Sequence, residues 1–121
     1  MTFPPITFKH TNTPVAYHLQ EIVTQKFESL AHHVAGDTTV RCEVEFEKVA
    51  PHHNGPVYRV EVNIWVSGVM YRVEKTAESF DRAIDVVRAD IDRELQRART
   101  KKQSLWRKGA RRMKDMMRFG G

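Results

Sequence analysis

The spacing of apolar residues changes along the chain and predicts a succession of strands and helices. A short apolar run at residues 6–9 is typical of a strand. Apolar residues then recur on one helical face, at Val15, Leu19, Ile22, Val23, Phe27 and Leu30. The preceding Asn12-Thr13-Pro14 sequence suits a helix start, because it offers a capping side chain and a proline for the first turn. We therefore expect a strand, then a helix that begins there and ends at Gly36-Asp37.

From residue 38 the apolar period becomes two, which indicates strands with one buried face. The inward positions are Val40, Cys42, Val44 and Phe46 in one segment, and Tyr58, Val60, Val62, Ile64 and Val66 in the next. Residues 51–56 contain Asn54-Gly55 and are expected to form a loop. Ser67-Gly68 predicts a tight hairpin turn into a further strand through Tyr71 and Val73. Three antiparallel strands in a row follow from these turns.

A second, long helix is expected to start at residues 77–79, with an apolar stripe about five turns long. Its apolar stripe contains Phe80, Ile84, Val87, Ile91, Leu95 and Ala98. The predicted fold class is α+β, a two-layer sandwich with the order β-α-β-β-β-α and both helices packed on one face of a four-stranded sheet. The opposite face stays polar, with Glu43, Glu45, Glu47 and Glu61 expected to pair with Arg41, Arg59 and Arg72.

Charge is distributed unevenly between the two ends of the chain. Residues 93–121 contain eleven Lys or Arg against Glu94 and Asp115, a net charge of +9, whereas residues 1–92 carry nine basic and thirteen acidic side chains, a net charge of −4. A basic block at one end is typical of proteins that bind nucleic acid. We divide the chain into a domain at residues 1–102 and a basic C-terminal tail at residues 103–121.

The tail leaves three interpretations open: a basic arm that orders on RNA, an amphipathic helix for an acidic membrane or a protein groove, and a solvating segment. Trp106, Ala110, Met113 and Met117 recur at helical spacing, whereas Gly109 and the terminal glycines weaken a helix. Trp106 and Phe119 are candidates for stacking on unpaired bases.

Composition limits the remaining chemistry. One cysteine, Cys42, excludes an intrachain disulfide, and no apolar run is long enough to span a membrane. We find no signal peptide and expect a cytoplasmic protein without cofactors. The histidine pairs His32-His33 and His52-His53 have no cysteine or carboxylate cluster beside them in the sequence, so no metal site is predicted. No catalytic motif is present, and an enzyme is not expected.

Residues on the second helix carry a resemblance to a known family. The run from Ser79 through Ala83-Ile84-Asp85, followed by Asp92-Arg93-Glu94-Leu95, resembles the ribosome hibernation-promoting factor and ribosome-associated inhibitor A family. The similarity extends from residue 6 to about residue 102 and includes the order of the elements. With nineteen residues after Lys102, the chain is similar to the short members, which lack a dimerisation domain.

The resemblance implies a stress-response and stationary-phase factor that binds the small ribosomal subunit and its 16S rRNA, occupies the decoding channel and blocks mRNA and tRNA. The implied and expected RNA contacts are Lys26, Arg88, Arg93, Arg97, Arg99, Lys101, Lys102, Arg107, Lys108, Arg111 and Arg112. A small ribosome modulation factor is a further candidate partner, and we expect a monomer off the ribosome. The chain departs from the family at Ser29, Asp81 and Asp90, which removes positive charge from the domain. The alternative is a general interaction module for double-stranded RNA or a protein partner.

Overall fold

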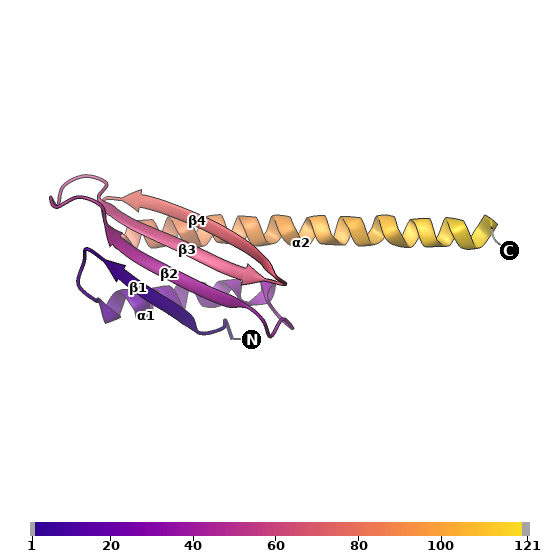
Figure 1. Ribbon diagram of the computed structural model, residues 1–121, viewed down its shortest axis with the longest axis horizontal. Helices are drawn as coiled ribbons and strands as arrows, with labels where there is room; N and C mark the ends of the chain where they lie inside the picture. Colours follow the sequence, from indigo (N-terminus) through magenta and orange to yellow (C-terminus); the bar gives the residue numbers. More distant parts are fainter. Residues whose placement is uncertain (1, 120–121) are drawn as a thin grey trace.

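The four strands form one mixed sheet, and both helices cover the same face of it (Figure 1). The computed structural model describes residues 2–119, and their side chains except at positions 104, 106 and 110–119. The elements are β1 (Ile6–Thr11), α1 (Tyr17–Phe27), the 3-10 helix η1 (Glu28–His33), β2 (Arg41–Lys48), β3 (Tyr58–Val66), β4 (Val69–Ala77) and α2 (Phe80–Phe119). The sheet order is β1-β2-β3-β4, with β1 parallel to β2 and the other pairs antiparallel. This arrangement confirms the predicted fold class.

The core lies between the sheet and the two helices and uses the predicted alternating positions. Directly opposed pairs on β2 and β3, such as Val44 with Val62 and Phe46 with Val60, are buried on the helix side. The helices contribute Leu19, Val23 and Phe27 from α1, Leu30 from η1, and Ala83, Ile84, Val87, Ile91 and Leu95 from α2. Burial of apolar surface on both sides of this interface is the main stabilising contribution to the fold.

The first helix begins later than the sequence predicts. Asn12 ends β1 with a positive φ of 56°, and the backbone stays non-helical until Ala16, whose carbonyl accepts the N–H of Leu19 at 3.0 Å. The predicted start at Asn12-Thr13-Pro14 is therefore wrong, because Asn12 turns the chain instead of capping a helix. Val15 falls outside the helix and is 55% exposed. The predicted apolar stripe is otherwise retained, although its last turn is the tighter 3-10 helix η1.

The predicted hairpin between β3 and β4 is confirmed. Ser67 and Gly68 both have positive φ, 51° and 80°, which is the geometry of a tight type I′ turn. The carboxylate of Asp37 accepts the N–H of Ser67 at 2.7 Å and also accepts from Thr39. These hydrogen bonds, the largest effect coming from the Thr39 hydroxyl, lower the pKa of Asp37 to about 2. Asp37 thus fastens the segment before β2 to the hairpin.

Helix α2 is continuous over forty residues and extends far beyond the end of the sheet (Figure 1). The Ser79 hydroxyl caps its first turn by accepting the N–H of Arg82 at 3.2 Å. At 1.5 Å per residue the helix is about 60 Å long. Its backbone does not break at residue 103, so the division into a domain and a tail stays a prediction. Among the described residues, no helix is long and apolar enough to cross a membrane.

Candidate nucleic-acid interface

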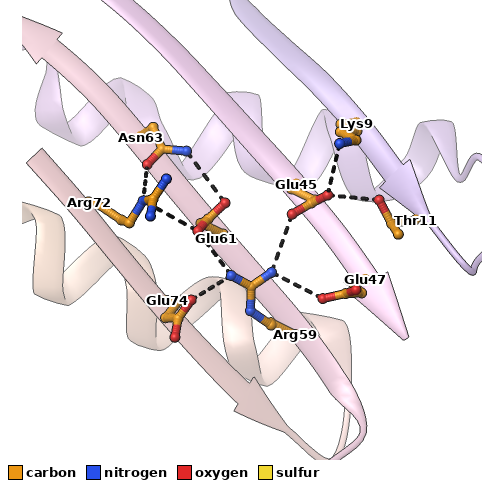
Figure 2. Close-up of polar contacts among 9 residues, drawn as sticks. All are labelled: Lys9, Thr11, Glu45, Glu47, Arg59, Glu61, Asn63, Arg72 and Glu74. Atoms are coloured by element: carbon orange, nitrogen blue, oxygen red, sulfur yellow. Dashed lines mark hydrogen bonds and ion pairs between the residues drawn. The ribbon is translucent and has the colours of Figure 1, made fainter. Parts of the chain in front are cut away.

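The exposed face of the sheet is organised around Arg59, as Figure 2 shows. Its Nη1 lies 3.3 Å from a carboxylate oxygen of Glu45 and 3.2 Å from one of Glu47. Its Nη2 lies 3.0 Å from Glu61 and also donates to Glu74. The hydrogen bond to Glu74 is the main reason that the pKa of Arg59 rises further above its ordinary value. This guanidinium is therefore permanently charged and fully engaged within the protein.

The other polar side chains of this face extend the same network (Figure 2). Thr11 donates its hydroxyl to Glu45 at 2.7 Å, which is the largest contribution to the lowered pKa of Glu45. Arg72 lies 3.4 Å from Glu61, as the sequence predicts. Carboxylates outnumber cations on the face: Glu43, Glu45, Glu47, Glu61 and Glu74 stand against Lys9, Arg41, Arg59 and Arg72. The sheet is thus unsuited to a polyanion.

Arg41 does not pair with a carboxylate within the described structure, and that expectation is wrong. Its guanidinium carbon lies 4.5 Å from the ring centroid of Trp65, the residue directly opposite on β3. A cation over the face of an indole is attracted by the ring quadrupole. Arg41 is thereby placed at the edge of the polar face rather than inside the ion-pair network.

On the helical side, three of the predicted RNA contacts already have acidic partners. Lys26 on α1 pairs with Asp85 on α2, Arg93 pairs with Asp90, and Arg97 lies 3.3 Å from Glu94. The last two are pairs of residues three positions apart on α2. The positive charge of these side chains is partly neutralised before any ligand arrives.

Arg88 is also held by a residue of the neighbouring helical segment. Its Nη1 donates to the hydroxyl of Ser29 at 3.3 Å. Ser29 and Asp90 are two of the positions at which the sequence departs from the family it resembles, and each now contacts a predicted RNA-binding arginine. Both residues therefore engage arginines that are expected to bind RNA.

The cations of α2 beyond Arg97 differ from those that precede them. Arg99, Lys101, Lys102, Arg107 and Lys108 are exposed, and none of them forms an ion pair within the described part of the chain. Arg111 and Arg112 belong to the helical backbone, but their side chains lie outside the described residues, as do those of Trp106 and Phe119. At 100° per residue these positions surround the helix rather than forming one stripe. The strongest available positive field therefore begins at Arg99.

A cluster that the sequence did not predict joins η1 to α2. His33, whose side chain is 1% exposed, has its Nε2 at 2.7 Å from Asp92, and its ring lies against His32 at a centroid distance of 3.9 Å. Three potential metal ligands are thus within 4.8 Å of one another, because the fold brings to this histidine pair one carboxylate that is distant in the sequence. Metal ligation through Nε2 would require a proton on Nδ1, which is buried without a hydrogen-bond partner in the described structure. The geometry instead fits a hydrogen bond from Nε2–H to Asp92.

These features define the class of protein: a two-layer α+β binding domain whose final helix carries a basic run without ion pairs among its described side chains. The family model described as "Sigma 54 modulation protein / S30EA ribosomal protein" matches residues 6–103. The chain therefore belongs to this family, which confirms the resemblance seen in the sequence. The family consists of ribosome-associated proteins rather than enzymes. No curated protein matches the chain.

Two solved structures share the fold. A ribosomal subunit interface protein from Coxiella burnetii has a TM-score of 0.61 at 11% sequence identity, covering 78% of this chain and 97% of that one. The N-terminal domain of Thermus thermophilus Protein Y has a TM-score of 0.54 at 20% identity, covering 77% of this chain and 98% of that one. At these identities the comparison establishes the architecture.

Proposed function

We propose that this protein is a hibernation and translation-inhibition factor that binds 16S rRNA in the decoding channel of the small ribosomal subunit. Occupation of that channel excludes mRNA and tRNA. The observation that carries the proposal is the family match over residues 6–103, combined with a basic run on α2 that no described carboxylate neutralises. The name of the Coxiella burnetii protein, a ribosomal subunit interface protein, supports the same location.

The proposed contacts fall into two groups, which differ in whether an existing contact within the protein must be broken before RNA can bind. Arg99, Lys101, Lys102, Arg107 and Lys108 are free to meet phosphates directly, and the predicted contacts Arg111 and Arg112 follow them in the sequence. Lys26, Arg93 and Arg97 must exchange a carboxylate for a phosphate, and Arg88 must leave Ser29. Breaking an exposed ion pair costs only about 0.2–1 kcal/mol. Contacts with the dense phosphate charge of RNA can offset that loss.

The same proposal includes the setting in which the protein acts. It works in the cytoplasm during stationary phase or stress and is a monomer when it is off the ribosome. A small ribosome modulation factor is the further partner that the short members of the family suggest.

Sedimentation of the purified protein with small subunits tests the location. At low salt the protein should sediment with the particle, and at high salt it should be released, because phosphate contacts are lost as counterions compete. A protein that stays at the top of the gradient at low salt contradicts the proposal. Comparable affinity for any double-stranded RNA would instead favour the alternative of a general RNA-binding module.

A matched pair of variants tests the basic run. Lys101→Gln with Lys102→Gln removes two exposed cations from α2, and Lys48→Gln with Lys75→Gln removes two from the strands. Losing two phosphate contacts should reduce the slope of log affinity against log salt by about 1.4–1.8. The strand variant should leave the slope unchanged. Deletion of residues 103–121 should reduce the slope further, and an unchanged slope would show that this segment does not contact RNA.

A further inference from the structure

A groove of about 660 Å³ lies where α2 leaves the domain, and the RNA-binding proposal does not use its apolar floor. Three parts of the chain form it: the segment after η1, the β3–β4 hairpin and α2. Figure 1 shows the hairpin and η1 at the same end of the sheet, beside the emerging helix. We call it the root groove and define its floor by Val34, Val66, Val69, Tyr71, Leu95 and Leu105.

The floor of the root groove exposes apolar side chains to solvent. Val69 on β4 is 52% exposed and Leu105 on α2 is 60% exposed, whereas Leu95 is buried. A single exposed Leu or Val is ordinary, but a continuous apolar surface in a concavity is typical of a binding site. The lining residues of α2 run from Leu95 to Leu105, about 15 Å of helix, so the groove follows α2 and can accept an elongated ligand that lies beside it.

The charged groups around the groove restrict what can occupy it. Arg99, Lys101 and Lys102 line one wall, and none of them forms an ion pair within the described residues. Asp37 lies on another wall, but its carboxylate is already bound by Ser67 and Thr39. The available charge in the groove is therefore positive, beside an apolar floor.

We propose that the root groove docks an amphipathic helical segment of a protein partner, with apolar residues on one face and Glu or Asp along its flank. The apolar face would cover Val69, Leu95 and Leu105, and the acidic flank would pair with Arg99, Lys101 and Lys102. Such a ligand uses the helix-in-groove mode of recognition. A second copy of this chain is a poor occupant, because its own basic run would face the same cations.

RNA is also a poor occupant of the apolar floor, although it would compete for Arg99, Lys101 and Lys102 on the wall. Unpaired bases bind by stacking on aromatic side chains, and Tyr71 is the single Phe, Tyr or Trp among the described residues that line the groove, while the His32 and His33 rings there lie against each other. The proposal extends the proposed function, because Arg99, Lys101 and Lys102 are RNA contacts there. A partner in the groove and RNA on α2 would therefore weaken each other's binding.

The test uses a synthetic fourteen-residue peptide with Leu at helical spacing on one face and Glu elsewhere. Its control has the same composition, but its Leu residues are distributed around the helix. Binding to the full-length protein is measured by fluorescence anisotropy and mapped by amide chemical shifts. We expect the amphipathic peptide to bind at least tenfold more tightly than the control and to shift Val69, Tyr71, Leu95 and Leu105. Equal binding of the two peptides, or shifts confined to other surfaces, would overturn the proposal.

Neutral substitutions separate this proposal from the proposed function. Leu105→Gln and Val69→Gln should each weaken the amphipathic peptide at least fivefold, whereas Val15→Gln, at a similarly exposed valine before α1, should not. Because no charge changes, all three variants should keep their affinity for small ribosomal subunits within about twofold. Loss of peptide binding in the Val15 variant would refute docking in the root groove, and it would leave the proposed binding to ribosomes untouched. A homopolymeric RNA that shifts the same apolar residues would refute it in favour of nucleic acid.

Discussion

Three carboxylates hold cations that the proposed function assigns to RNA, and removing those carboxylates should strengthen RNA binding. The pairs are Lys26 with Asp85, Arg93 with Asp90, and Arg97 with Glu94. The perturbation is the triple variant Asp85→Asn, Asp90→Asn and Glu94→Gln, which keeps side-chain size and removes the negative charges. Each released cation becomes available to a phosphate without first breaking an intramolecular contact.

The expected magnitude follows from the exposure of the pairs. Every one of the six side chains is at least 30% exposed, so each pair is a surface ion pair worth about 0.2–1 kcal/mol. Three pairs together return about 0.6–3 kcal/mol to binding, which is roughly a three- to 160-fold gain in affinity. The salt slope of log affinity should stay nearly the same, because the three cations contact the same number of phosphates in both proteins once the wild-type pairs have exchanged.

The assay is the affinity for small ribosomal subunits, titrated between about 50 and 200 mM salt. The matched control is Glu21→Gln, Glu78→Gln and Asp81→Asn, which removes three carboxylates that form no ion pair among the described residues. Its net charge equals that of the triple variant. If the control strengthens binding equally, overall charge explains the effect and the release of Lys26, Arg93 and Arg97 is refuted.

Three further predictions concern the domain itself. Arg59→Met should lower the free energy of unfolding by about 2 kcal/mol in a urea titration, because four carboxylates lose their shared hydrogen-bonded cation. Salt should restore part of this loss by screening their repulsion, and an unchanged urea midpoint would contradict the network. The lowered pKa of Asp37 stabilises the fold above its unfolded pKa of about 4, and this stabilisation is lost as the pH falls toward 2. Asp37→Asn should therefore weaken the dependence of the free energy of unfolding on pH between those two values. A variant that keeps the wild-type pH dependence would show that Asp37 contributes nothing. Burial raises the pKa of the Cys42 thiol to about 12, so a thiol reagent should modify it only in the unfolded protein, and rapid labelling under native conditions would contradict its burial.

The elements that the sequence predicts well are those set by local patterns. Alternation in β2 and β3 identifies the buried positions around Val44 and Val62, since successive strand side chains point to opposite faces. The Ser67-Gly68 turn and the start of α2 near Ser79 likewise follow from short-range chemistry. The start of α1 was missed because Asn12, a good capping residue, is also one of the few residues that readily adopt a positive φ.

The candidate site depends on contacts that sequence patterns cannot supply. Lys26 and Asp85, and likewise His33 and Asp92, are separated by fifty-nine positions and meet because α1 and η1 lie beside α2. Which faces of two helices touch is decided by packing, not by the period of either helix. Counting charge therefore located the basic end of the chain, but it could not show which arginines already have partners. The partner of Arg41, Trp65, likewise required the register of β2 against β3.

The continuity of α2 fixes the rotational phase between its buried stripe and its C-terminal charges. Ile91 and Leu95 anchor one side of the helix in the core, so the directions of the described cations Arg99, Lys101 and Lys102 are set by their distances in residues from them. One residue inserted between Leu95 and Arg107 would rotate all subsequent positions by about 100° while leaving composition and net charge almost the same. The number of residues in α2 after Leu95, as much as their identity, therefore determines the direction of each charged side chain that the structure describes there.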